Sequence, residues 1–286
     1  ISGLRAELQA LGDSLVVVGG EGLWNVHVHV HDVGAAVEAG IKAGRPSRIA
    51  VTHFAEQVAR ARERLAPQEG RRVVVLAAGD GLAELFTQAG AEVLRFTTTA
   101  RPSVPQVLAA IRASGAREVV VLPNDGPNLA VCEAAAAAAA EQDQHVVVIP
   151  TRAQVQGIAA LAVHDPARPI DQDVVSMTSA AKGARDGGVT IATDTAITSA
   201  GPCQPGDVLG ISNGDFSVVG SDLYDVSVQV LGSMMSAGEL ITLVSGADGG
   251  NLAQRVEAWV HEHHPAVDVL VYEGGQARYP LLFSVE

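Results

Sequence analysis

One stretch decides the fold of most of this chain: Val73-Val74-Val75-Leu76-Ala77-Ala78-Gly79-Asp80-Gly81. The run Val73–Ala77 is apolar without alternation, which is typical of a strand buried on both faces in a parallel sheet. Gly79-Asp80-Gly81 then forms a turn that opens a helix through Leu82 and Phe86. A buried strand followed directly by a helix is the repeating unit of an α/β fold.

The same strand-then-helix order continues beyond this unit. Further buried strands are expected at Val93–Phe96, Glu118–Leu122 and His145–Ile149. Right-handed crossovers would wind the helices onto both faces of one parallel sheet. From Gly187, shorter strands separated by glycine turns predict a second sheet, with Val267–Tyr272 as its last strand. We therefore predict an α/β region with two subdomains, at about 73–186 and 187–286.

Ligands of such folds bind at the loops that follow the carboxyl ends of the parallel strands. The glycine turn resembles the turn of nucleotide-binding folds, but no G-x-G-x-x-G or Walker sequence is present. The alternative is a plain turn in which glycine supplies the backbone angles. The loop Pro123–Asn128 is rich in Asn, Asp, Gly and Pro, a composition that suits a turn as well as a binding site. The four loops are Ala78–Gly81, Thr97–Ser103, Pro123–Asn128 and Pro150–Gln156.

Residues 1–54 have a different pattern and predict a small α+β domain of helix, hairpin, helix and strand. Asp32 is placed to cap the second helix, which Gly44 and Pro46 would end. The expected elements are a helix at Gly3–Leu11, hairpin strands at Ser14–Val18 and Leu23–His31, a helix from Val33 to about Ala43, and a strand at Ser47–Phe54.

The second hairpin strand contains Val26-His27-Val28-His29-Val30-His31-Asp32, in which valine and histidine alternate. Successive side chains of a strand point to opposite faces, so the three imidazoles share one face. Neighbouring histidines on one face can converge on a metal ion or a phosphate. The alternative is a strand with a polar outer face and a valine inner face, which the same spacing fits.

Residues 55–72 are rich in Glu, Gln and Arg and end in Pro67-Gln68-Glu69-Gly70. This composition is typical of a charged linker, and it is the best domain boundary in the chain.

Composition limits the classes of function. The formal net charge of -13 argues against binding to nucleic acid or to an anionic membrane surface. Two cysteines, Cys132 and Cys203, form no disulfide framework and favour a reducing cytoplasm. No apolar run approaches the ~20 residues of a membrane span, and no signal peptide is visible. The chain opens on Ile1, so we expect it to be the remainder of a longer protein.

Sequence motifs of common catalytic sites are absent: there is no G-x-S-x-G, H-E-x-x-H or C-x-x-C. The histidines His261, His263 and His264 stand at the end of the last predicted helix. There they are expected to interact with the helix dipole rather than with a metal.

Several blocks of the sequence, in register, resemble one bacterial family. The first block is Leu11-Gly12-Asp13-Ser14-Leu15-Val16-Val17-Val18-Gly19, followed by His27-x-His29 and Asp32-x-Gly34. It is similar to the middle domain of the DAK phosphatase (dihydroxyacetone-kinase-like) proteins, which are the kinase component FakA of fatty acid kinase. The further matching blocks are Ala77–Leu82, Leu122-Pro123-Asn124, Val148–Thr151, Gln156-Gly157 and Tyr272-x-Gly274-Gly275-Gln276-x-x-Tyr279-Pro280.

The resemblance implies an order of three domains: an ATP-binding DhaL-type domain, this middle domain, and a C-terminal domain similar to DegV and to the FakB carriers of fatty acids. The DhaL domain's acidic loop for ATP and Mg has no counterpart here. By this resemblance, residues 1–54 correspond to the middle domain and residues 73–286 to the DegV-like domain.

The resemblance also implies a function and partners. The full protein would use ATP to phosphorylate a fatty acid bound to a FakB-type carrier, giving an acyl phosphate for phospholipid synthesis. The present chain would position that partner, form a homodimer and have no activity by itself. The alternative is a DegV-like protein that binds a lipid or another small ligand without catalysis.

Carried over to this sequence, His27 and His29 match the family's His-x-His, which resembles a zinc-type or catalytic cluster completed by a cysteine before Ile1. Neither Cys132 nor Cys203 matches that cysteine. We hypothesise that His31 could supply a third nitrogen.

In DegV-like carriers, hydroxyl residues and a Ser/Gly-rich loop bind the fatty acid head group. Here Gly79-Asp80 and Pro123-Asn124-Asp125-Gly126 stand in those places. An acidic side chain would repel a carboxylate. We therefore predict a carrier-like fold that has lost lipid binding and serves for partner docking or dimerisation.

Overall fold

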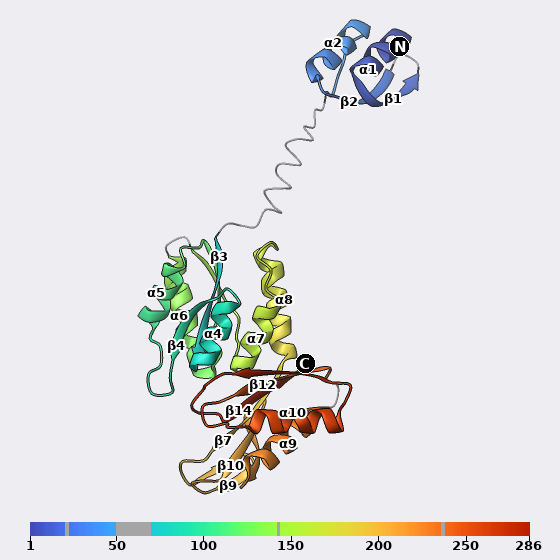
Figure 1. The fold of residues 1–286 in the computed structure, drawn as a ribbon. Coiled ribbons are helices and arrows are strands. Elements are labelled where there is room, and N and C mark those ends of the chain that lie inside the picture. Colours follow the sequence, from blue (N-terminus) through green and yellow to red (C-terminus); the bar gives the residue numbers. More distant parts are fainter. Residues whose placement is uncertain (21–22, 50–69, 142–143, 236–237) are drawn as a thin grey trace. The chain divides into compact units, whose positions relative to one another are not determined.

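A computed structural model describes residues 1–20, 23–49, 70–141, 144–235 and 238–286 (Figure 1). The chain divides into two compact units, Ile1–Arg64 and Leu65–Glu286. Each unit is described by itself below. Most of the predicted linker, residues 55–69, lies outside the described residues.

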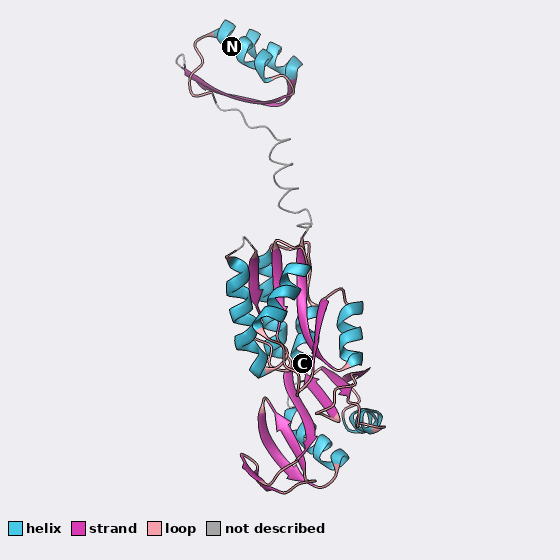
Figure 2. Cartoon of the chain, turned by 90° about the vertical axis from the view of Figure 1, so that its left-hand side faces the viewer, coloured by secondary structure: helices cyan, strands magenta, loops and turns pink. Residues whose placement is uncertain are grey.

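The first unit consists of two helices and a β-hairpin, as predicted. Figure 2 shows both helices on the same side of the hairpin, with Leu8 and Ala39 buried. Asp32 caps the second helix, because its Oδ1 accepts a hydrogen bond from the Ala35 backbone N–H at 3.0 Å. The strand predicted at 47–54 is wrong for Ser47–Ile49, which form no strand, and its remainder lies outside the described residues. The elements are α1 (Ser2–Leu11), β1 (Gly12–Gly20), β2 (Leu23–Val30) and α2 (Val33–Ala43).

The second unit begins with a four-stranded parallel sheet in the order β4-β3-β5-β6, which confirms the α/β prediction. Its strands are β3 (Arg71–Ala78), β4 (Glu92–Phe96), β5 (Glu118–Leu122) and β6 (His145–Val148). Its helices are α4 (Asp80–Gln88), α5 (Val104–Ala113), α6 (Leu129–Ala140), α7 (Gln154–Ala162) and α8 (Ile170–Gly183), with a short 3₁₀ turn η1 (Gly126–Asn128) before α6.

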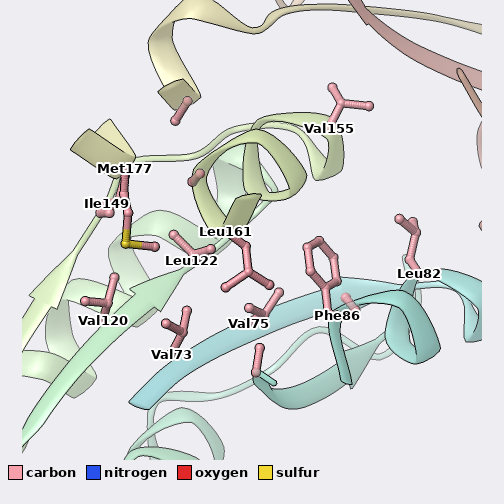
Figure 3. Packing of buried hydrophobic residues seen from close by; sticks show 14 of the residues in the cluster. Val73, Val75, Leu82, Phe86, Val120, Leu122, Ile149, Val155, Leu161 and Met177 are labelled. Atoms are coloured by element: carbon pink, nitrogen blue, oxygen red, sulfur yellow. The ribbon is translucent and has the colours of Figure 1, made fainter. Parts of the chain in front are cut away.

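The valine run of β3 is buried on both faces because helices cover both sides of the sheet. Val73 and Val75 pack in one cluster with Phe86 of α4, and with residues of α7 and α8; Figure 3 shows this cluster. Val74 and Leu76 point the other way, into a cluster with residues of α5 and α6. The unbroken apolar run therefore contributes side chains to two hydrophobic clusters, one on each face of the sheet.

A second, six-stranded sheet follows, in the order β11-β10-β7-β14-β12-β13. The helices α9 and α10 pack on it around Phe283, whereas Val244 and Leu282 join the cluster of the first subdomain. The two subdomains therefore share a core. The elements are β7 (Arg185–Ile191), β10 (Val208–Ser212), β11 (Asp215–Gly220), α9 (Leu223–Met234), β12 (Leu240–Ser245), α10 (Leu252–His263), β13 (Asp268–Glu273) and β14 (Leu281–Val285), with a separate hairpin of β8 (Ala196–Thr198) and β9 (Gly201–Cys203).

The strand predicted at Val267–Tyr272 is present as β13, but the prediction that it is the last strand was wrong, because β14 follows it. β14 runs antiparallel to both β12 and β7 and lies between them. All of its side chains are buried. It therefore joins the β7–β10–β11 meander to the β12–β13 pair in a single sheet.

The end of the predicted linker also needs correction, because β3 begins at Arg71. The Arg71 side chain is fully buried and pairs with Glu118 at 3.0 Å and with Asp173 at 3.2 Å. These carboxylates neutralise the buried Arg71 guanidinium. The local sequence alone would place this residue in solvent, as part of a charged linker.

Among the residues that the structure describes, no helix has the length and apolar character needed to cross a membrane.

Candidate functional site

The two histidines predicted as a site converge in the first unit. His27 and His29 project from β2 on one face, and their Nε2 atoms are 3.1 Å apart. The ring centroids are 5.0 Å apart, with an angle of 70° between the planes. Both residues are exposed, whereas on the other face Val28 and Val30 are half-buried and Val26 is 41% exposed. The alternation thus gives both a polar outer face and a convergent pair of imidazoles.

His31 does not extend this pair. It follows the end of β2, at the bend before α2, and is exposed. Within the described parts of the chain, no group of three or more His, Cys, Asp or Glu side chains is arranged to hold a metal ion. The hypothesis of a third nitrogen from His31 is therefore not supported by the structure. His27 and His29 fit two positions of a tetrahedral zinc site, whose neighbouring ligand nitrogens lie roughly 3.3 Å apart.

The two cysteines are both buried in the second unit. Cys132 belongs to the core between the sheet and helices α5 and α6, and Cys203 is also buried. Burial raises the pKa of the Cys132 thiol to about 12, so it stays protonated at neutral pH.

In the second unit, the glycine turn after β3 is covered by the chain itself. The backbone N–H of Leu82 donates to the carbonyl of Gly274 at 3.0 Å, and a Cβ at Gly81 would collide with the carbonyl of Glu273. Gly79 has φ +113°, which L side chains rarely adopt. Segment 273–276 therefore packs against the backbone of this turn, which favours the plain-turn alternative.

The loops after β5 and β6, which the sequence named as candidate ligand loops, carry amides whose burial it did not predict. Asn124 (φ +54°), Asn128 and Gln154 are each at most 5% exposed. Gln154 Nε2 donates to the Asn124 carbonyl at 3.1 Å, and the Asn124 N–H donates to Thr151 Oγ1 at 3.0 Å. Both polar side-chain atoms of Asn124, Asn128 Nδ2 and Gln154 Oε1 have no hydrogen-bond partner among the described residues. These amide groups could form hydrogen bonds with a polar ligand, but an amide cannot act as a general acid or base.

Asp80 and Asp125, the acidic residues of the loops after β3 and β5, are both paired. Asp80 accepts a hydrogen bond from Arg95 Nη1, and Asp125 accepts one from Arg101 Nη1, each at 2.6 Å. These partners weaken the predicted repulsion of a carboxylate ligand. The contact of segment 273–276 with the turn after β3 is the stronger argument that the lipid site of the carriers is lost here. This loss stays a prediction.

Tyr279 and Asp186 lie close to the same edge of the parallel sheet. Burial raises the pKa of the Tyr279 phenol and of the Asp186 carboxyl. Gln156 Nε2 donates to Asp186 Oδ1 at 3.0 Å and links α7 to the second sheet. In the sequence, Tyr279 stood out only as a member of a family block, and Gln156 as a member of a family block and of the loop Pro150–Gln156.

The histidines at the end of α10 are placed as predicted. His263 Nδ1 lies 2.9 Å from the carbonyl of Trp259, one of the last carbonyls of the helix. The His263 ring also stacks on Trp259, with centroids 5.0 Å apart. This contact supports the capping interpretation for His263, and for His261 and His264 it stays a prediction.

Solved structures define the class of the second unit. A DegV family protein from Corynebacterium glutamicum aligns with 77% of this chain and 97% of its own, with a TM-score of 0.56 and 14% identity. The fatty acid kinase B3 protein of Streptococcus pneumoniae, solved with linoleic acid, aligns with 76% of this chain and 99% of its own, with a TM-score of 0.52 and 10% identity. At these identities the likeness shows the fold alone, which is of the DegV type.

The sequence then places the chain in a family. Residues 1–61 match the middle domain, and residues 72–286 the C-terminal domain, of the FakA-like proteins of fatty acid kinase. The chain belongs to this FakA-like family.

Curated relatives match over the same length. A protein of Staphylococcus haemolyticus, SH1689, is 30% identical over 298 residues, and protein YloV of Bacillus subtilis is 27% identical over 298 residues. Each match covers 99% of this chain and 53% of the relative. The chain thus spans about half the length of the curated relatives that it matches.

Proposed function

We propose that this chain supplies the middle and C-terminal parts of a fatty acid kinase. The observation that carries this proposal is the match to both family domains, in order, over residues 1–61 and 72–286. The full protein transfers the γ-phosphate of ATP to a fatty acid presented by a DegV-type carrier. ATP and Mg²⁺ bind to a DhaL-type domain of that protein, and a reaction that uses ATP is expected in the cytoplasm.

The reaction sets limits on what the histidines need to do. One carboxylate oxygen of the fatty acid forms a bond to the γ-phosphorus, while the bond from that phosphorus to the bridging oxygen of ADP breaks. A carboxylate is ionised at neutral pH, so it needs no general base. What the transfer needs is positioning and stabilisation of negative charge on the phosphoryl oxygens.

His27 and His29 suit this electrostatic role. Two exposed imidazoles with Nε2 atoms 3.1 Å apart can donate hydrogen bonds to one phosphoryl group, or they can hold a zinc ion with further donors from outside the described residues. Bound zinc would supply positive charge for a phosphate oxygen. In either case the β2 strand fixes the two nitrogens relative to each other.

Metal analysis tests the zinc part of this proposal. We expect about one zinc ion per full-length chain, and expect it to be lost in His27→Ala, because two ring nitrogens of a tetrahedral site come from this pair. The His31→Ala variant is the matched control and should keep its zinc. Absence of zinc from both the wild type and His27→Ala would end the zinc proposal.

The C-terminal part is proposed to position the carrier, and it is proposed to form a homodimer. Its DegV-type fold is combined with a turn closed by Gly274 and its neighbours, which leaves the α4 N-terminus covered. A carrier-like domain that binds no lipid can still present a surface to a true carrier.

The alternative is a DegV-like protein that binds lipid without catalysis. It is favoured by the fold, since one such neighbour, from Thermotoga maritima, is described as having a fatty acid binding function. Organic extraction of the purified full chain, followed by mass spectrometry, separates the two functions. We expect no stoichiometric fatty acid, because segment 273–276 fills the edge of the sheet. Recovery of about one fatty acid per chain would favour the alternative.

A further inference from the structure

A cleft of about 440 Å³ lies in the second subdomain, between the end of β7, the β8–β9 hairpin and the loop 277–280. Hydrogen bonds hold its walls in place. Thr190 Oγ1 donates to the carbonyl of Arg278 at 2.9 Å, and Ser199 Oγ donates to the carbonyl of Phe216 at 2.6 Å. The cleft is therefore preformed.

The floor of the cleft is apolar. Ala192, Cys203 and Leu209 form a small buried cluster with Phe216 packed against it, and all four line the cleft. An apolar side chain that enters the cleft would replace water next to this carbon surface.

The rim carries three charged side chains that have no ionic partner in the described parts of the chain. Asp194, Asp248 and Arg278 line the cleft and are exposed. Among the described residues, none of the three forms an ion pair. The Arg278 guanidinium lies instead over the Tyr279 ring, 5.3 Å from its centroid. Two carboxylates and one guanidinium leave a net negative rim, which attracts a cation.

The surroundings indicate an occupant larger than a metabolite. Ile191 in the lining is 46% exposed. Ile197 stands on β8 between the lining residues Ala196 and Thr198, so its side chain lies on the opposite face of that strand, where it is 91% exposed. A small ligand inside the cleft would leave Ile197 in water, whereas an extended segment paired with β8 has side chains on both faces and would cover it. Among the strands described, β8 pairs only with β9, so its other edge can accept an extended segment.

We infer that this cleft binds an extended segment of a partner protein, in which an apolar side chain stands next to a lysine or arginine. The segment pairs with the free edge of β8, and its apolar side chain fills the cleft over Leu209 and Phe216. The basic side chain reaches Asp194 and Asp248, and neighbouring residues of the segment cover Ile197.

Peptide selection on the full chain tests this inference. A phage library of random peptides is selected on the wild type and counter-selected on the double variant Asp194→Lys/Asp248→Lys. We expect the enriched sequences to place Lys or Arg beside an aliphatic or aromatic residue. A synthetic peptide of that sequence should lose about 10-fold or more in affinity for the double variant and for Ile197→Ser, and should bind more weakly in high salt.

Matched controls keep the outcome clear, since the replaced side chains are exposed and the fold should persist. Val175→Ser, which changes a 68% exposed valine on α8, and Asp171→Lys/Asp268→Lys should leave the affinity unchanged. The inference is overturned by a lack of enrichment, by enrichment of acidic sequences, or by peptides that bind both cleft variants as tightly as the wild type.

Discussion

Asp173→Ala is expected to lower the free energy of unfolding of the second unit by about 3–5 kcal/mol. The Asp173 side chain is fully buried. Its carboxylate accepts hydrogen bonds from Arg71 Nη1 at 3.2 Å and from the Asp165 N–H at 3.0 Å, and it lies 2.8 Å from His164 Nδ1. Removing it leaves the buried Arg71 guanidinium with one carboxylate fewer, and a buried charge without full compensation is strongly destabilising.

Urea unfolding followed by circular dichroism measures this effect. Asp171→Ala is the matched control, because Asp171 is exposed in the same turn of α8 and should change stability by no more than about 0.5 kcal/mol. Asp173→Asn keeps the shape of the side chain and should lose less than Asp173→Ala. Equal midpoints for Asp173→Ala and Asp171→Ala would contradict the importance of the buried ion pair.

The fold was predictable wherever the signal was local. The apolar run Val73–Ala77 required a strand covered on both faces, and the structure places separate helix clusters on its two sides. Asp32 indicated the start of α2 through a side chain that the local backbone needs. Such features depend on residues close in sequence, so one sequence is enough to reveal them.

The errors arose where a residue's environment is built by distant segments. The sequence around Arg71 is typical of a charged linker. Its burial depends on the ion pair with Asp173 of α8, which is distant in the sequence. Leu281–Val285 is short and contains a serine, Ser284, that is fully buried. It becomes a central strand only through pairing with β7 and β12, which no local pattern reveals.

The candidate sites divide in the same way. Strand alternation predicted that His27 and His29 share a face, and their Nε2 atoms do converge. The closure of the Gly79–Gly81 turn could not be predicted, because Gly274 comes from the far end of the chain. The cleft beside β8 was also missed, since the predicted strands did not include that hairpin.

The second large effect concerns catalysis by the full-length protein. With ATP, Mg²⁺, a fatty acid and a DegV-type carrier, the wild type is expected to form acyl phosphate, and His29→Ala is expected to do so about 100-fold more slowly. The variant loses one of two preorganised groups that stabilise charge on the phosphoryl oxygens, either as hydrogen-bond donors or as metal ligands. Removing one such donor at other enzyme sites lowers kcat by about 10²–10³-fold. His31→Ala should retain the rate, because His31 lies beyond the pair.

Acyl phosphate formation by wild type, His29→Ala and His31→Ala, each shown to be folded by circular dichroism, tests the central claim most directly. The account predicts product that depends on the carrier, a large loss for His29→Ala and none for His31→Ala. No acyl phosphate from the wild type, or equal rates for wild type and His29→Ala, would contradict it.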